Sequence, residues 1–170
     1  MTGGWALDLF LGRTREHHDL DLAMLRREQD EVRAHLAAWD LHVHHEGALT
    51  AWAPGTRLPH DRQVVWGRTA AYLPWQVELY FENAESDQWV FMPDDRVRLP
   101  LLAFGLETPD GLPYVRPEVV LLHRAGRRSD SDDADLTAIA ERLTGTGKTW
   151  LRDALELVYP GHRWLDALRG

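Results

Sequence analysis

The chain contains no cysteine and has fewer basic than acidic residues. The absence of cysteine excludes disulfide bonds, thiolate zinc sites and cysteine nucleophiles. With 19 Lys and Arg residues against 27 Asp and Glu residues, the formal net charge is −8. Binding along nucleic acid needs a basic face that displaces counterions from phosphates. We therefore expect no nucleic-acid partner, and the acidic balance favours cationic small molecules or metal ions.

The sequence also lacks a long apolar run. No stretch approaches the roughly 20 apolar residues that cross a bilayer, and the N-terminus lacks the basic-then-apolar order of a signal peptide. We therefore expect a cytoplasmic protein without a membrane partner. Hydrophobic residues make up 44% of the 170 positions, enough for the core of a small domain. The eight tryptophans are unusual, and we expect some in the core and some lining a pocket.

The first half of the chain combines helical and strand periodicities. Apolar residues three and four positions apart predict a helix over residues 3–12 and another over 26–39. Between them, alternating residues predict a strand at 19–24. The period then changes to two, and Gly and Pro separate the runs. Short connections of this kind favour antiparallel neighbours. These strands are predicted at 41–46, 48–53, 63–67, 76–82 and 88–92.

The second half begins irregular and ends helical. Residues 93–116 contain several prolines and no clear period, so we expect no regular structure there. Pro117 and Glu118 suit the first turn of a helix, because proline is tolerated at that position and a carboxylate favours the positive end of the helix dipole. Two further amphipathic helices follow. The sequence therefore predicts an α+β fold with a catalytic domain at 1–116 and a helical segment at 117–170 packed on it.

Asp19 and Asp21 are the first candidate functional residues. Side chains two positions apart on a strand point to the same face. Leu20 and Leu22 then enter the core, and the two aspartates stand side by side on the other face. Adjacent carboxylates repel each other unless a cation lies between them, and Mg²⁺ binds carboxylate oxygens together with substrate phosphate oxygens. The pattern predicts a Mg²⁺ site, with a solvated strand face as the alternative.

Glu78 offers a third carboxylate on a later strand. Within residues 76–82 the apolar side chains share one face, and Glu78, Tyr80 and Glu82 share the other. If this strand lies beside the first, three carboxylates can hold two metal ions about 3.5–4 Å apart. One ion would bind a triphosphate, and the other would activate an acceptor hydroxyl. Glu82 is the alternative to Glu78, and either can act as the general base.

Gly3 and Gly4 open the first predicted helix and are candidate phosphate ligands. Glycine permits close backbone approach, and the free N–H groups of a helix N-terminus favour phosphate. Simple helix capping is the alternative. Arg13, Arg15 and His17 precede the strand with the aspartates. We interpret these three residues either as triphosphate contacts or as surface charges.

Three other features have alternative interpretations. Trp75 and Trp89 flank the Glu78 strand, and we expect them to pack in the core, with an aromatic wall against a sugar or a base as the alternative. His42 and His44 share one strand face, which we interpret as a solvated or inter-strand face rather than a metal site. Residues 145–149 are similar to the end of a P-loop. The pattern lacks its first glycine and a preceding strand, so a helix–helix connection is expected.

The segment GGWALDLFLGRTREHHDLDLAML resembles nucleotidyltransferases with the DNA-polymerase-β-like fold, in particular the aminoglycoside 2''-adenylyltransferase-like and lincosamide nucleotidyltransferase-like group. The resemblance extends to WQVELYFE, where Glu78 takes the place of the family's third acidic residue, commonly Asp. It extends also to GLPYVRPEVVLLHRA, where Arg124 stands at a frequent Lys position, and to GHRWL near the end. The matching residues in the first segment are Gly3, Gly4, Trp5, Ala6, Asp8, Gly12, Arg13, Arg15, His17, Asp19 and Asp21.

This resemblance implies a mixed sheet with flanking helices that binds Mg²⁺ and ATP or another nucleoside triphosphate. It implies transfer of a nucleoside monophosphate, with AMP as the first candidate, to a hydroxyl of a small molecule such as an aminoglycoside-like antibiotic. Asp19, Asp21 and Glu78 would be the catalytic and metal-binding residues. Two alternatives stay open: a catalytically weak nucleotide-binding or antitoxin-like module of the same fold, and an enzyme that modifies a protein hydroxyl.

Overall fold

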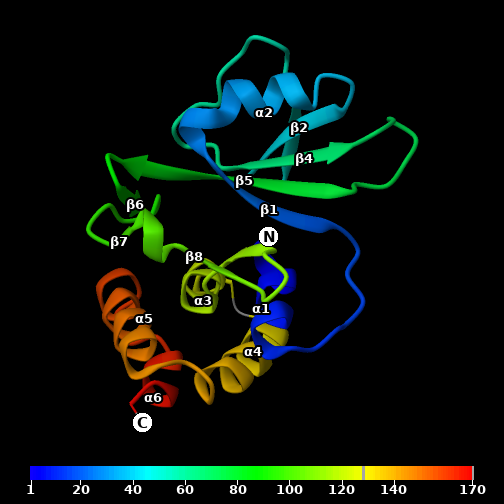
Figure 1. Ribbon diagram of the computed structural model, residues 1–170. Helices are drawn as coiled ribbons and strands as arrows, with labels where there is room; N and C mark the ends of the chain where they lie inside the picture. The colour runs from blue at the N-terminus through cyan, green and yellow to red at the C-terminus, as the bar shows by residue number, and fades with distance from the viewer. Residues whose placement is uncertain (128, 170) are drawn as a thin grey trace.

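The computed structural model describes residues 1–127 and 129–169 and has an α+β fold with a mostly antiparallel sheet and flanking helices, as predicted. In Figure 1 the sheet and α2 form the upper part of the molecule, and the other helices gather below it. The helices are α1 (Gly3–Leu11), α2 (Gln29–His35), α3 (Pro117–Ala125), α4 (Asp130–Ala140), α5 (Gly145–Val158) and α6 (Trp164–Ala167).

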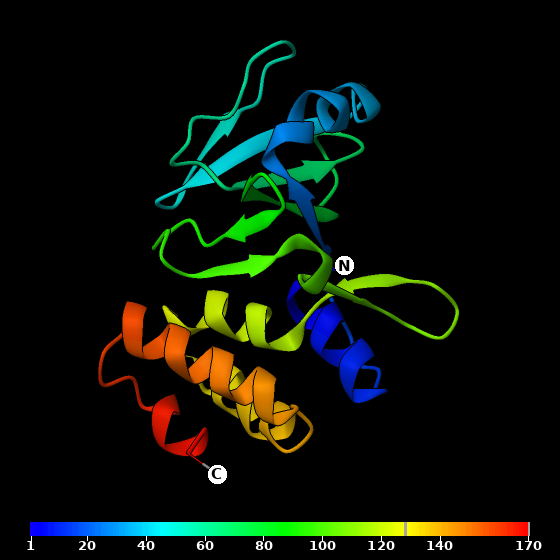
Figure 2. The same ribbon diagram turned by 60° about the vertical axis from the view of Figure 1, so that its left-hand side comes forward.

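The main sheet has the strand order β3-β2-β4-β5-β6-β7, and β1 pairs with β5. The β1–β5 pair is parallel, and the other neighbours are antiparallel. Strands β8 and β9 form a separate hairpin. Figure 2 shows this hairpin projecting beside α1. The strands are β1 (Leu20–Leu25), β2 (Asp40–His45), β3 (Ala48–Ala51), β4 (Val64–Arg68), β5 (Val77–Glu85), β6 (Gln88–Val90), β7 (Arg98–Pro100), β8 (Gly105–Glu107) and β9 (Pro113–Val115).

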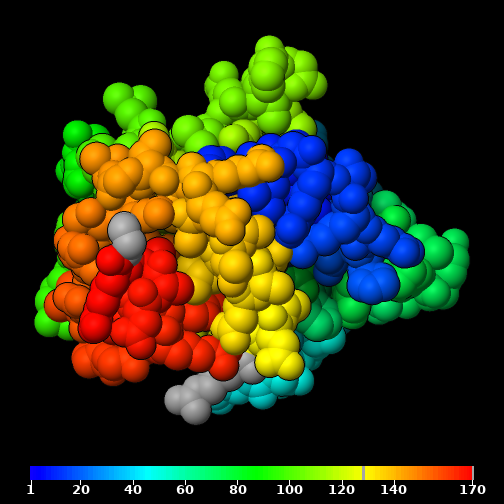
Figure 3. Space-filling view, turned by 90° about the horizontal axis from the view of Figure 1, so that it is seen from below, coloured from blue at the N-terminus to red at the C-terminus, as the bar shows by residue number. Residues whose placement is uncertain are grey.

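Two hydrophobic clusters lie in the described part of the chain, and β1 contributes to both. Leu20, Leu22 and Met24 pack against the cluster that α2 covers, where Val65 and Phe81 are fully buried. The intervening Ala23 instead packs against the helical cluster of α1 and α3 to α6. This alternation follows from the period of two along a strand. Figure 3 shows α1, α4, α5 and α6 side by side on the face opposite the sheet. The sheet face that carries Asp21 therefore looks toward the helices.

The first predicted helix is confirmed, and the second is shorter than predicted. Gly12 caps α1 in the left-handed region with φ 63°, where glycine carries no steric cost. Helix α2 ends at His35 instead of continuing to 39. Beyond it, the N–H of Ala37 bonds to the carbonyl of Ala34, and that of Trp39 to Leu36. These tighter i→i−3 bonds turn the chain so that Leu36 and Trp39 reach the sheet.

The expectation of an irregular segment at 93–116 was wrong, because β7, β8 and β9 lie in it. Proline does not prevent these strands, since Pro100 ends β7 and Pro113 begins β9, positions where a missing N–H is tolerated. The helix–helix connection expected at 145–149 was also wrong. Helix α5 begins at Gly145, because the hydroxyl of Thr144 accepts a hydrogen bond from the N–H of Gly147. The division of the chain at residue 116 stays a prediction.

A carboxylate site beside the start of the first helix

Asp21 and Glu78 lie opposite each other on the parallel strands β1 and β5. Residues paired in this way project to the same face of a sheet, about 4.8 Å apart. Burial raises the pKa of Asp21 to about 6, and the negative charges of Glu78 and Asp19 contribute to the shift. The structure thus places the other two predicted carboxylates, Glu78 and Asp19, within electrostatic range of Asp21. Their oxygens do not converge on one point, and no group of three acidic or histidine side chains in the described residues is arranged to hold a metal ion.

The carboxylate of Asp21 lies against the first turn of α1. This carboxylate accepts a hydrogen bond from the N–H of Gly4. The backbone carbonyl of Asp21 accepts another from the N–H of Thr2 at 2.9 Å. Gly3 has φ 58°, and an ideal Cβ there would lie 1.9 Å from Oδ2 of Asp21. Both the backbone conformation and the lack of space therefore require glycine at position 3. The two halves of the predicted site, glycine pair and aspartates, are in direct contact.

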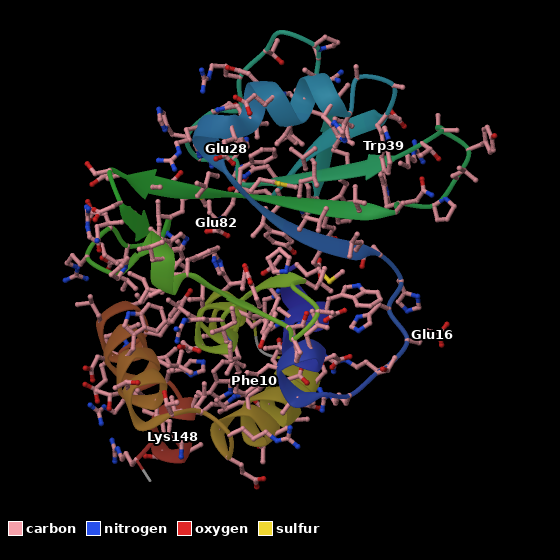
Figure 4. All side chains as sticks on the ribbon, viewed as in Figure 1. Phe10, Glu16, Glu28, Trp39, Glu82 and Lys148 are labelled. Atoms are coloured by element: carbon pink, nitrogen blue, oxygen red, sulfur yellow. The ribbon has the colours of Figure 1, made fainter. Side chains whose placement is uncertain are left out.

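Glu78 and Glu82 differ in their partners. The hydroxyl of Tyr80 donates to Oε2 of Glu78 at 2.6 Å. Burial and the Glu78 charge raise the pKa of Tyr80, so its hydroxyl stays a proton donor. Glu82 is 3% exposed, accepts a hydrogen bond from the indole of Trp89 at 2.9 Å, and lies 3.3 Å from Nε2 of His123. Figure 4 shows Glu82 between β5 and the helices.

Arg13, Arg15 and His17 bind two buried aspartates. Asp8 contacts Nε of Arg13 at 2.9 Å and Nε2 of His17 at 2.9 Å. Asp135 of α4 accepts from Arg13 at 2.6 Å and from Arg15 at 3.0 and 3.1 Å. Burial alone would raise the pKa of Asp135. The hydrogen bonds from both arginines outweigh burial, so the pKa of Asp135 lies below its ordinary value. The ion pairs join the loop before β1 to α1 and α4.

This ion-pair network reaches the carboxylate site through Trp5. The ring of His17 stacks on Trp5 with centroids 4.3 Å apart, and the indole N–H of Trp5 donates to the carbonyl of Asp19 at 2.7 Å. His17 also borders the glycine pair, because a Cβ at Gly4 would lie 2.9 Å from its ring. Trp5 therefore holds the loop that leads into β1, and with it the position of Asp19.

Arg124 of α3 approaches the site from the helical side. Its Nη1 atom donates a hydrogen bond to Asp135 at 2.7 Å. Its positive charge opposes the increase in the pKa of Asp21 without reversing it. Its Nε–H is buried and has no acceptor among the described residues. A cavity of about 20 Å³, room for roughly one water molecule, lies between Gly3, Tyr80, Arg124 and Arg127. Arg124 and Arg127 thus place positive charge between Tyr80 and the start of α1.

Sequence reasoning assigned no role to Asp8, Asp135 or Arg127. A signal for Asp8 existed, since it is an acidic residue within an otherwise apolar helix, and such a residue is rarely buried unless it is paired. Asp135 gave no such signal, because its partner Arg13 lies 122 positions away. Arg127 lies in a polar loop, and only the packing of α3 brings it near Tyr80.

The family model of the aminoglycoside-2''-adenylyltransferases matches residues 1–49 of the 170. The matched segment contains the glycine pair, the buried Asp8, and both Asp19 and Asp21, but it ends before Glu78. A comparison with curated proteins gives no match. The partial match supports an adenylyltransferase-like family with nucleotidyl transfer as its activity. None of the helices in the described ranges has the length and hydrophobicity needed to cross a bilayer.

Proposed function

We propose that the protein is a Mg²⁺-dependent nucleotidyltransferase, which moves a nucleoside monophosphate, AMP in the first instance, from a nucleoside triphosphate to a hydroxyl of a small molecule. The observation that carries this proposal is the position of Asp21. It lies opposite Glu78 in the sheet and touches the first turn of the helix that Gly3 begins. Carboxylates for a divalent cation and a helix N-terminus, which favours phosphate, are thereby adjacent.

Asp19, Asp21 and Glu78 are the residues that would hold Mg²⁺. The donor set fits this ion, because it consists of carboxylate oxygens that repel one another without a cation. Bound Mg²⁺ supplies positive charge to the triphosphate and lowers the pKa of an acceptor hydroxyl. Small rotations of side chains on fixed strands would bring the oxygens together, since the strand register already places Asp21 opposite Glu78.

The triphosphate is expected at the N-terminus of α1. Gly3 and Gly4 begin the helix whose N-terminus favours phosphate, and the N–H of Gly4 would exchange its bond with Asp21 for one with phosphate. Arg124 offers a buried Nε–H that has no acceptor in the described residues. Arg15 and His17 border Gly4 and remain candidate phosphate contacts. Together with Arg13, they also hold α1 against α4 through the buried aspartates.

Glu78 is proposed as the general base. One of its oxygens accepts a hydrogen bond from the Tyr80 hydroxyl, and this bond orients the carboxylate. The other oxygen is left to take the proton of the acceptor hydroxyl. The acceptor oxygen forms a bond to the α-phosphorus, the bond from that phosphorus to the bridging oxygen of the β-phosphate breaks, and pyrophosphate leaves. The proton passes to Glu78. Glu82 is the alternative base, and its contacts with Trp89 and His123 make it the less accessible of the two.

The test is pyrophosphate release from MgATP with a panel of aminoglycosides and lincosamides, together with mass analysis of the product. Asp21→Asn and Glu78→Gln are expected to lower turnover at least about 100-fold, because each removes a charge that contacts the metal or the reacting proton. Glu85→Gln is the matched control, since Glu85 is an exposed carboxylate on the same strand. No pyrophosphate with any acceptor and no stabilisation by MgATP would contradict the proposal.

A nucleotide-binding module without transfer activity is the second candidate. It is favoured by the contacts of Arg13, Arg15 and His17, which tie all three side chains to Asp8 and Asp135. Stabilisation by MgATP without product would indicate this function. Transfer to a protein hydroxyl is distinguished by mass spectrometry of cellular proteins after overexpression.

A further inference from the structure

An apolar groove of about 620 Å³ lies on the sheet face opposite the carboxylates, and α2, β1 and β5 line it. Strand β1 contributes Leu20, Leu22 and Met24. These side chains alternate with Asp21, which projects to the other face of the sheet. The groove is therefore separate from the site proposed for nucleotidyl transfer.

The described part of the chain leaves this groove uncovered. Helix α2 has seven residues and covers only part of the sheet face. Around the groove Leu22, Met24 and Leu36 are half-buried, whereas Phe81 of the same hydrophobic cluster is fully buried. Trp39, also half-buried, lies beyond the C-terminal end of α2 (Figure 4). Partly exposed apolar side chains that share one groove are typical of an interaction site.

Two ionisable side chains, Glu31 and His35, stand at the rim of the groove. They lie one turn apart on α2, and both are exposed. Neither has a hydrogen-bond or ion-pair partner among residues 1–127 and 129–169. The adjacent Asp30, by contrast, pairs with Arg57 at 3.0 Å. The rim of the groove thus offers one acidic and one basic side chain to a molecule that covers it.

The charges along α2 are complementary to themselves. The helix has acidic residues in its first turn and basic residues in its last turn. When a second copy of α2 lies antiparallel beside the first, Glu31 of each copy faces His35 of the partner subunit, and the helix dipoles are also antiparallel. Residues 26–39 contain three arginines and three acidic residues. The net charge of −8 therefore does not make this segment repel a second copy of itself.

We propose that this groove is the interface of a symmetric dimer, in which α2 of a second copy packs antiparallel beside α2 and covers the half-buried side chains of β1. A two-fold axis joins the same surface of both copies, so it buries both grooves and forms both pairs of Glu31 with His35. The inference does not rest on the proposed function. Asp21 and Glu78 project from the other face of the sheet, and the carboxylate site of each copy stays open in the dimer.

Association is measured by analytical ultracentrifugation of the full chain over a dilution series, and wild type is expected to form a dimer that dissociates on dilution. His35→Glu sets a carboxylate against Glu31 of the partner subunit in both pairs. It is expected to raise the Kd of dimerisation about 10-fold or more, because like charges then face each other. His60→Glu is the matched control, since His60 is an exposed histidine outside the groove. The control is expected to leave the Kd unchanged.

A second variant exchanges the two charges. Glu31→Arg combined with His35→Glu sets opposite charges against each other again and is expected to return the Kd to near the wild-type value. Circular dichroism checks folding, and Glu31→Arg alone replaces His35→Glu if that variant does not fold. Equal Kd values for wild type and His35→Glu, an equal rise with His60→Glu, or no recovery in the double variant would overturn the proposal. So would a wild type that is monomeric at every concentration, and binding of anilinonaphthalene sulfonate to that monomer would assign the groove to an apolar ligand instead.

Discussion

Replacing Asp21 with asparagine is expected to stabilise the metal-free protein at neutral pH. Burial, Glu78 and Asp19 raise the pKa of Asp21 from 3.8 to about 6 in the folded state. The unfolded chain has no such neighbours and gives up the proton near the ordinary value. Between these two pKa values the unfolded state is the more readily ionised, so folding stability falls as the pH rises. The loss of folding stability caused by Asp21 is complete above about pH 6 and absent below about pH 4.

The magnitude follows from the size of the shift. About two pKa units at about 1.4 kcal/mol each correspond to nearly 3 kcal/mol. Asp21 is half-buried rather than fully enclosed, and solvent screening reduces the figure to about 1–2 kcal/mol. Asparagine keeps an oxygen for the N–H of Gly4 but carries no charge, so it removes the repulsion and retains the hydrogen bond. A gain of this size raises the melting temperature by several degrees in a domain of this length.

The assay is urea unfolding of wild type and Asp21→Asn in EDTA at pH 7.5 and pH 4, with the exposed Asp95→Asn as control. The variant is expected to be more stable at pH 7.5, and the difference should shrink below about 1 kcal/mol at pH 4. Adding Mg²⁺ at pH 7.5 should stabilise only wild type and Asp95→Asn. The difference in free energy of unfolding between Asp21→Asn and wild type should therefore become smaller. A variant that is less stable at pH 7.5, or a difference that grows as the pH falls, would show that the charge of Asp21 does not destabilise the folded state.

Two further substitutions test the network and the glycine turn. Asp135→Asn leaves three arginines without their buried partner and is expected to cost about 3–5 kcal/mol in urea unfolding. Asp153→Asn, which removes one partner of an exposed ion pair, should lower the free energy of unfolding by less than about 1 kcal/mol. Equal losses for the Asp135 and Asp153 variants would argue against a buried network. Gly3→Ala is expected to lower the melting temperature much more than Gly12→Ala. Both sites have positive φ, but only at Gly3 does a Cβ collide with Asp21. Equal effects would show that backbone strain alone matters.

Local patterns sufficed for most elements of the first ninety residues. Period-two alternation predicted the strands, and helical spacing with a glycine cap predicted α1. The alternation along this strand also predicted that Leu20 and Leu22 pack in a hydrophobic cluster. These predictions succeeded because they depend on the few residues within one turn or one strand. The three short strands at 93–116 were missed, because each is held by partners rather than by its own sequence.

The contacts between distant residues were not predictable in the same way. The parallel register that sets Asp21 opposite Glu78, rather than one residue further, is fixed by the packing of both strands against α2 and the helices. The ion pair between Arg13 and Asp135 depends on where α4 packs against α1. The ring of Trp66 stacks on that of His44 only because β4 pairs with β2.

A strand that carries an aspartate and follows a helix that begins with glycine was predictable from the sequence, because alternation along a strand and the conformational freedom of glycine are local properties of the chain. Which charges meet at that aspartate depends on the packing of the whole fold. Pairing of strands and docking of helices are settled by burial summed over the whole fold, and no short segment contains that information.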